Sequence, residues 1–231
     1  MKIGKCITLA TAALFLTGLL ATVALARNET KDVQDSANVL KTIMEIPEKG
    51  IPPVLLRNAQ AIVIVPDVIK GAFIVGGRHG TGVLLVRQDN GGWSDPVFVS
   101  LTGGSVGWQV GGTATDVILV FKHRKGVEGL LKGKFTLGAD AAVAAGPVGR
   151  SAEAATDVML KSEILSYSRS RGLFAGVSLE GAALLVDEDA TDAYYGKKGL
   201  HASDILAGKA GKPTAATRSL KQLLTRYSTM K

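Results

Sequence analysis

The sequence predicts an α+β fold, in which mostly antiparallel strands form a barrel-like or sandwich core flanked by N- and C-terminal helices. Short β-branched runs recur along residues 60–186 at spacings of roughly 8 to 15 residues, too short for helical crossovers between parallel strands. Glycine is abundant, with 28 residues, and aromatic residues make up only 5%, which favours strands joined by tight turns. Helical periodicity is clearest near the two ends of the chain.

The first 26 residues have the pattern of a cleaved signal peptide. Lys2 and Lys5 precede an uncharged apolar run over 6–26, which closes with the small-x-small sequence Ala24-Leu25-Ala26. An uncleaved membrane anchor is the alternative, because about 20 apolar residues can span a bilayer. We expect cleavage after this sequence, a single domain over 27–231, and an exported protein that is periplasmic or secreted and peripherally associated with a membrane.

Composition excludes several kinds of chemistry in the processed chain. The only cysteine, Cys6, lies in the signal segment, so disulfides, thiol nucleophiles and zinc–cysteine sites are excluded. Two of the 27 Lys and Arg residues also lie there, which leaves 25 against 20 Asp and Glu, a net charge of +5. This excess favours anionic partners such as lipid headgroups or polysaccharide. Export argues against nucleic acid as the partner, and we expect no cofactor.

Residues 29–46 form a predicted amphipathic helix. Val33, Leu40 and Met44 recur at helical spacing, with charged residues on the remaining positions. One interpretation is a helix that packs on the core. The other is a helix that lies in a membrane interface, although its mixed charges differ from the Lys/Arg-rich polar face typical of such helices.

The β-rich core is predicted over residues 60–186. The continuous β-branched run at 61–65 is typical of a strand buried on both faces. Asn90-Gly91 is a hairpin signal. A short helix is expected at 127–131 and a C-terminal helix at 214–228, whereas the small apolar residues of 135–148 leave strand and helix open. The remaining predicted strands are 73–75, 82–86, 97–99, 117–121, 163–168 and 173–180.

Ser105 lies in a G-x-S-x-G sequence, the pattern that presents the nucleophile of α/β-hydrolases. A triad would then use Asp187, Asp189 or Asp192 as the acid and His201 as the base. That motif needs a helix after the serine, but a second glycine-rich run follows Ser105. Because glycine costs roughly 1 kcal/mol relative to alanine inside a helix, we interpret the segment as a glycine-rich strand in which Ser105 is structural.

Metal and nucleotide sites find little support. The three histidines, His79, His123 and His201, are scattered, and the acidic group at 187–192 lacks the glycine and terminal glutamate of a calcium loop, so we read it as a solvated turn. The glycine-rich stretch 77–82 opens a predicted strand, whereas a dinucleotide loop opens a helix. We expect no metal site.

The clearest charge feature is the basic segment, Lys122, His123, Arg124 and Lys125, directly after the predicted strand 117–121. It is interpreted either as a solvated loop or as an edge that binds lipid headgroups, since each Lys or Arg near an anionic bilayer contributes about 1 kcal/mol. Lys132, Lys134 and the more remote Arg150 extend the patch.

An ordered series of motifs resembles the SYLF domain over essentially the whole processed chain. The matching sequences are Gly76-Gly77-Arg78, Gly80-Thr81-Gly82-Val83, Trp93-Ser94-x-Pro96, Gly103 to Gln109, Asp116-Val117, Ser166 to Phe174 and Tyr194-Tyr195-Gly196. The resemblance implies a non-enzymatic domain that binds lipid, with an N-terminal amphipathic helix at the membrane in eukaryotic members. Some eukaryotic members bind actin, which is not expected as a partner of an exported protein.

The sequence therefore predicts a non-enzymatic protein of the cell envelope that binds an anionic lipid or membrane surface. Two sets of residues are candidates for that contact: the basic segment 122–125 and the apolar stripe of Val33, Leu40 and Met44. A serine hydrolase based on Ser105 and a purely structural envelope protein are the alternatives.

Overall fold

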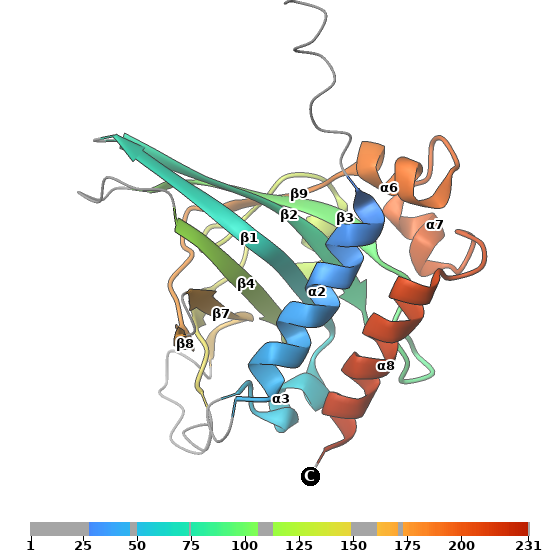
Figure 1. Ribbon diagram of the computed structural model, residues 1–231, viewed down its shortest axis with the longest axis horizontal. Coiled ribbons are helices and arrows are strands. Elements are labelled where there is room, and N and C mark those ends of the chain that lie inside the picture. The colour runs from blue at the N-terminus through green and yellow to red at the C-terminus, as the bar shows by residue number, and fades with distance from the viewer. Residues whose placement is uncertain are drawn as a thin grey trace, which may run out of the picture.

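The computed structural model describes residues 28–46, 50–73, 75–105, 113–148, 161–170 and 173–230. These residues form a strongly curled, mostly antiparallel sheet with helices on both faces (Figure 1), so the predicted α+β class is confirmed. The strands are β1 Ala61–Phe73, β2 Val75–Val86, β3 Val97–Ser105, β4 Thr113–Phe121, β5 Phe135–Thr136, β6 Val143–Ala145, β7 Ile164–Ser170, β8 Leu173–Gly176 and β9 Ala183–Val186. The helices are α2 Glu29–Met44, α3 Pro53–Asn58, α4 Arg124–Leu131, α6 Glu188–Tyr195, α7 Ala202–Leu206 and α8 Ala215–Thr229.

Strand order in the sheet is β5-β9-β3-β2-β1-β4-β7-β6, with β8 paired to β7. The pairs are antiparallel except β6 with β7, which are parallel. The hairpin signal at Asn90-Gly91 is confirmed: Gly91 has φ of +81° in the turn between β2 and β3. Residues 135–148, left open by the sequence, contribute the two short strands β5 and β6.

The central strands are buried on both faces, as the run at 61–65 predicted. Ile62 and Ile64 face a cluster that includes the apolar sides of α2, α3 and α8. Val63 and Val65 face a second cluster that includes α4, α7 and β5. Because successive side chains of a strand point to opposite faces, α8 and α4 lie on opposite sides of the sheet.

The first strand is longer than predicted. The expected strand 73–75 is instead the junction of β1 and β2, and β1 continues from the 61–65 run through Pro66 and Asp67. A register shift between Val65 and Val68 marks a bulge there. Asp67 has φ of +47°, and its N–H donates to the Asp116 carboxylate on β4. A proline is tolerated within this strand because a bulge removes the need for its ladder hydrogen bond.

The terminal helices match their predicted bounds closely and are capped by local side chains. The Asn28 Oδ1 accepts from the Lys31 N–H at the start of α2, and the Thr214 Oγ1 accepts from the Thr217 N–H at the start of α8. The two helices lie side by side across the sheet (Figure 1). Within the described residues, no helix combines the length and apolar character needed to cross a bilayer. The predicted signal segment lies outside the described residues.

Two segments predicted as loops are helical. The acidic group at 187–192 begins α6, where the Asp187 carboxylate accepts from the Ala190 N–H as an N-cap. The helix expected at 127–131 begins three residues earlier, at Arg124. The last two residues of the basic segment therefore belong to a helix, not to a loop.

Candidate anion-binding site on α4

The structure places the basic segment at the junction of β4 and α4. Lys122 is half-buried, and His123, Arg124 and Lys125 are exposed. His123 is the N-cap residue with an extended backbone, and its side chain makes no capping hydrogen bond to the described first turn. The first turn of α4 therefore combines exposed cationic side chains with backbone N–H groups that lack a side-chain cap.

Cations at this end of a helix do not stabilise the fold. The N-terminus of a helix carries a partial positive charge, so Arg124 and Lys125 are unfavourable there by about 0.3–1 kcal/mol each. Arg124 lies 3.4 Å from the fully exposed Asp89 carboxylate, a surface ion pair of small energetic value. The buried Oε2 of Glu163 lies near Gly126 on the inner side of the first turn and offsets part of the positive field. The outer side is left cationic.

Three lysines meet around one small groove beside α4. Lys125 comes from the first turn of α4, Lys132 from its C-cap and Lys134 from the connection to β5, and together they line a groove of about 280 Å³. Phe135 and Gly129 also line it. Gly129 allows the close approach of the aromatic ring, because a Cβ there would lie 3.0 Å from the Phe135 ring. We call this feature the lysine groove.

The lysine groove has the chemistry of a weak, exchangeable anion site. Its three ammonium groups outnumber the carboxylates of Glu128 and Asp140, and the Asp140 carboxylate already accepts from the Thr136 N–H at 2.6 Å. Lysine supplies compact, hydrated point charges on flexible stems, which suit a phosphate that arrives from several directions. Lys132 and Lys134 extend the patch as the sequence indicated, whereas Arg150 lies outside the described residues.

The apolar stripe of the N-terminal helix is buried in the core. Val33 and Leu40 are fully buried between α2, the sheet and α8, and Met44 is half-buried against the same cluster. These side chains can reach a bilayer only if α2 leaves the sheet. The packed helix is therefore the arrangement that the structure shows, and membrane insertion of this stripe remains a hypothesis that requires opening of the domain.

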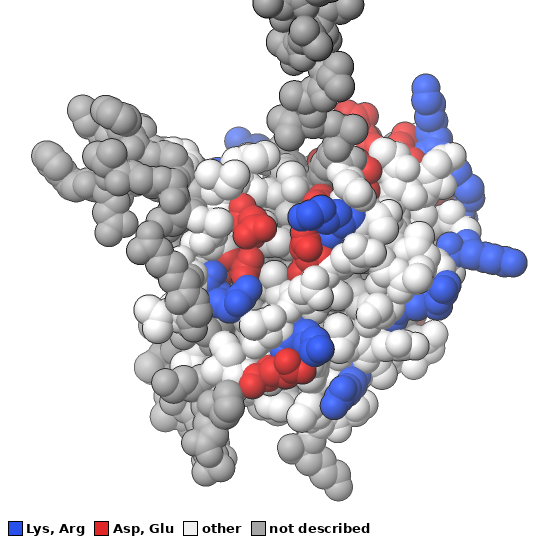
Figure 2. Space-filling model, viewed as in Figure 1, with Lys and Arg blue, Asp and Glu red and all other residues white. Residues whose placement is uncertain are grey.

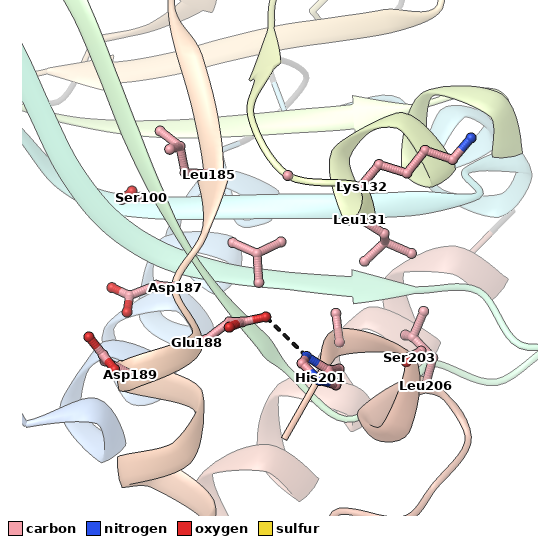
Figure 3. Close-up of a pocket in the computed structure, with 13 residues that line it drawn as sticks. Ser100, Leu131, Lys132, Leu185, Asp187, Glu188, Asp189, His201, Ser203 and Leu206 are labelled. Carbon is pink, nitrogen blue, oxygen red and sulfur yellow. Dashed lines mark hydrogen bonds and ion pairs between the residues drawn. The ribbon is translucent and has the colours of Figure 1, made fainter. Parts of the chain in front are cut away.

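A second, larger cleft of about 910 Å³ lies between β9, the end of α4 and helices α6 and α7. In Figure 3, Glu188 and His201 line the cleft and face each other, and the Glu188 Oε1 lies 3.2 Å from the His201 Nδ1. Both side chains are exposed. Lys132 lies on the α4 side of the same cleft (Figure 3). No sequence motif indicates this pair, because Glu188 at the start of α6 and the N-cap residue His201 of α7 are brought together only by the fold.

The hydrolase triad does not form. Ser105 is the last residue of β3 and pairs with Gly76, whereas Val99 of the same strand pairs with Val186, next to Asp187. Six residues at about 3.3 Å each put Ser105 roughly 20 Å along the strand from the acidic group and His201. The segment through Ser105 is a strand as predicted, and residues 106–112 lie outside the described part.

The acidic residue Asp192, a candidate acid of the triad, has a structural role in a turn. The Asp192 carboxylate accepts from the N–H groups of Gly199 and Leu200, at 2.6 and 2.9 Å, and fixes the turn between α6 and α7. Among the residues that the structure describes, no group of three or more His, Cys, Asp or Glu could hold a metal ion.

Comparison with known proteins assigns the chain to a family. A profile described as "Ysc84: Las17-binding protein actin regulator" matches residues 102–227. The chain is 35% identical over 208 residues to Protein YSC84 of Saccharomyces cerevisiae, covering 87% of this chain and 44% of that protein. It is 33% identical over 207 residues to SH3 domain-containing YSC84-like protein 1 of Xenopus laevis, covering 87% and 61%. It is 33% identical over 195 residues to the Homo sapiens protein of the same name, covering 82% and 56%.

The chain thus spans about half the length of these relatives. The lysine groove and the Ser166–Arg169 strand motif both lie inside the profile match. The ordered motifs, the confirmed α+β fold and these matches lead to one conclusion: the chain belongs to the Ysc84 family of SYLF-type domains.

Proposed function

We propose that this chain is a non-catalytic domain that binds anionic lipid headgroups at a bilayer surface, with the lysine groove as the contact. The observation that carries the proposal is the meeting of Lys125, Lys132 and Lys134 around one groove. His123 and Arg124, which directly precede Lys125 in the chain, are exposed as well. Arg124 and Lys125 are costly for α4 itself, because cations in the first turn of a helix are unfavourable. A phosphate bound beside the first turn would reverse that cost.

The groove fits a headgroup better than a whole small molecule. A volume of about 280 Å³ is below the usual range of about 300–1,000 Å³ for ligand pockets. Its exposed lysines contact phosphates without enclosing them, and each contributes about 1 kcal/mol near an anionic surface. Binding of this kind is expected to need anionic lipid and to weaken with salt, because surface charges are screened within about 8 Å at physiological ionic strength.

The site of action that we propose is the cell envelope, after export directed by residues 1–26. The A-x-A sequence and the charged first residues support that proposal. Intact-mass analysis of the exported protein tests it. We expect the mass of a chain that begins at Arg27. A mass that still contains residues 1–26 would overturn it.

Vesicle flotation of the protein purified after export tests lipid binding. We expect flotation with vesicles of phosphatidylglycerol and phosphatidylcholine, and none with phosphatidylcholine alone. Replacement of Lys125, Lys132 and Lys134 by glutamine removes about 3 kcal/mol of attraction at the groove, a weakening there on the order of 100-fold. A matched control replaces Lys31, Lys41 and Lys161, which are exposed elsewhere, and carries the same net charge.

Two results would contradict the proposal. Equal flotation with neutral and anionic vesicles would remove anionic lipid as the ligand. Equal losses in the groove variant and the matched control would remove the groove as the site. The family description names an actin regulator, so co-sedimentation with actin filaments is measured in parallel; actin binding without vesicle binding would assign the basic surface to a protein partner.

A further inference from the structure

The positive charge of the chain is concentrated at its C-terminal end. After Asp204 the sequence contains six Lys or Arg residues and no Asp or Glu. One of them, Lys221, is engaged inside the fold, where its Nζ lies 2.8 Å from the Asp95 carboxylate. Lys212, Arg218 and Arg226 are exposed. We call these three residues the α8 basic face. None of them belongs to the lysine groove.

The outward direction of this face follows from the helix period. Leu220 and Leu224 of α8 are fully buried against the sheet. Arg218, Gln222 and Arg226 are exposed at positions i, i+4 and i+8, the stripe on the other side of the helix. Figure 2 shows Lys and Arg side chains projecting from the margin of this side of the molecule, near α7 and the start of α8.

The lysine groove points the other way. Val127 and Leu130 of α4 belong to the cluster on one face of the sheet, and Leu220 and Leu224 of α8 belong to the cluster on the opposite face. Lys125 and Lys132, one heptad apart, lie on the side of α4 away from the sheet. Arg218 and Arg226 of α8 therefore lie on the opposite side of the sheet from Lys125 and Lys132, and one flat bilayer cannot contact both pairs. Lys212 does not share in this opposition, because it follows Ala210, which packs in the same cluster as α4.

The chemistry of the α8 basic face fits a lipid surface better than a folded protein. Protein interfaces have an apolar or aromatic centre that supplies most of the binding energy. Among the described residues, the large exposed hydrophobics are Val54, Ile69, Leu173 and Met230, and of these only Met230, the C-cap residue four positions after Arg226, adjoins the face. Cations with a single apolar side chain at one end, and no apolar centre, complement a diffuse, fluid layer of phosphates.

We propose that the domain bridges two anionic bilayers, with the lysine groove on one and the α8 basic face on the other. This inference rests on the proposed lipid binding and adds a consequence that single-sided binding does not have. A monomer with two opposed lipid contacts cross-links vesicles at low protein-to-lipid ratio. At saturating protein each vesicle is coated on its own, and cross-linking declines.

Dynamic light scattering of phosphatidylglycerol-containing vesicles tests the inference on the protein purified after export. We expect vesicle clustering that rises and then falls with protein concentration, and that high salt reverses. Replacing Lys212, Arg218 and Arg226 by glutamine is expected to leave flotation through the groove within about threefold of wild type. Clustering by this variant is expected to need at least about tenfold more protein, because one of its two contacts is lost. The groove variant is expected to lose clustering likewise, and the Lys31, Lys41 and Lys161 control to cluster like wild type.

Each outcome separates this inference from the function on which it rests. A wild type that does not float defeats the proposed function, whereas one that floats without clustering vesicles defeats the bridging inference alone. Clustering by the α8 variant at wild-type concentrations also defeats it. Self-association gives another route to clustering, so multi-angle light scattering measures oligomeric state; a wild-type dimer that becomes monomeric in the α8 variant would make α8 a protein interface and overturn the inference.

Discussion

At the scale of single residues, one ion pair holds the bulged part of the sheet in place. The Asp116 carboxylate on β4 is nearly buried and accepts from the Nε and Nη2 of Arg169 on β7, at 2.9 and 2.6 Å. Its other oxygen accepts from the N–H of Asp67, whose positive φ marks the bulge in β1. Asp116 and Arg169 both occur in the motifs that resemble the SYLF domain. The structure explains the presence of these two residues, because their contacts join the strands β1, β4 and β7.

Two tyrosines provide a prediction about alkaline stability. Burial raises the pKa of Tyr167 and of Tyr195 well above the usual range, and nearby Asp95 and Tyr194 raise that of Tyr195 further. The Tyr195 hydroxyl also donates to the Pro96 carbonyl at 2.8 Å. Both phenols therefore stay neutral in the folded protein above pH 10, where an unfolded chain ionises its tyrosines. The stabilising effect is present below about pH 10 and is lost as pH rises toward the folded pKa.

Ultraviolet titration of phenolate measures this effect. Tyr167 and Tyr195 are expected to ionise only together with loss of the folded circular dichroism signal, in one cooperative step. Tyr195→Phe removes one of the late-ionising groups and serves as the assignment control. Reversible ionisation of all four tyrosines while the fold persists would show that these rings are accessible to solvent.

At the scale of elements, glycine makes possible a close approach of two central strands. A Cβ at Gly82 of β2 would lie 2.0 Å from the Ile64 carbonyl oxygen of β1, so alanine would force the two central strands apart. Gly104 of β3 has no atom within 4 Å of such a Cβ. We expect Gly82→Ala to lower the free energy of unfolding by about 3 kcal/mol or more, and Gly104→Ala to change it by less than about 0.5 kcal/mol.

Urea unfolding of the two alanine variants provides the comparison, with Gly104→Ala as the matched control on the neighbouring strand. Similar midpoints for the two variants would mean that β1 and β2 are less closely packed at Gly82 than the structure indicates. A large loss of stability confined to Gly82→Ala would show that glycine in the stretch 77–82 serves the close packing of two strands, a role that a nucleotide loop does not need.

The start of α4 was predicted less well than the terminal helices and the central strands. Short β-branched runs placed the central strands, and apolar residues at helical spacing placed the terminal helices. The structure adds side-chain caps at Asn28 and Thr214. The start of α4 has no such signal: His123 is a poor cap, and the basic residues after it are unfavourable at a helix N-terminus. Packing of Val127 and Leu130 on the sheet overrides that local preference.

At the scale of the whole molecule, the sequence indicated which residues form the site but not how they are arranged. Lys125, Lys132 and Lys134 are close in sequence and could be grouped as a basic patch, and the groove between them depends only on α4 and β5. The Glu188–His201 pair and the opposition of α4 to α8 depend on sheet topology. The parallel pair of β6 and β7 likewise has no signal in periodicity, because it joins residues about 20 positions apart.

Whether α2 stays in the fold at a membrane is also a property of the whole molecule. Full burial of an apolar side chain such as Val33, Leu40 or Ile43 is worth about 1.5–3 kcal/mol. Insertion into a bilayer could compensate these side chains of α2 for their lost burial. It could not compensate the apolar surfaces of the sheet and of α8 that α2 now covers. We therefore expect α2 to remain docked while the lysine groove and the α8 basic face contact lipid.

Deletion of residues 29–46 would not test this expectation, because it removes part of the core. Hydrogen exchange on anionic vesicles does test it. The peptides of α2 alone do not discriminate, since an inserted helix is also protected. The discriminating peptides come from α8 and from the part of β2 beneath α2. Docked binding is expected to leave β2 unchanged and to slow exchange in α4 and in α8. Faster exchange in β2 and α8 on vesicles would instead show that α2 has left the sheet, and would restore its apolar stripe as the membrane contact.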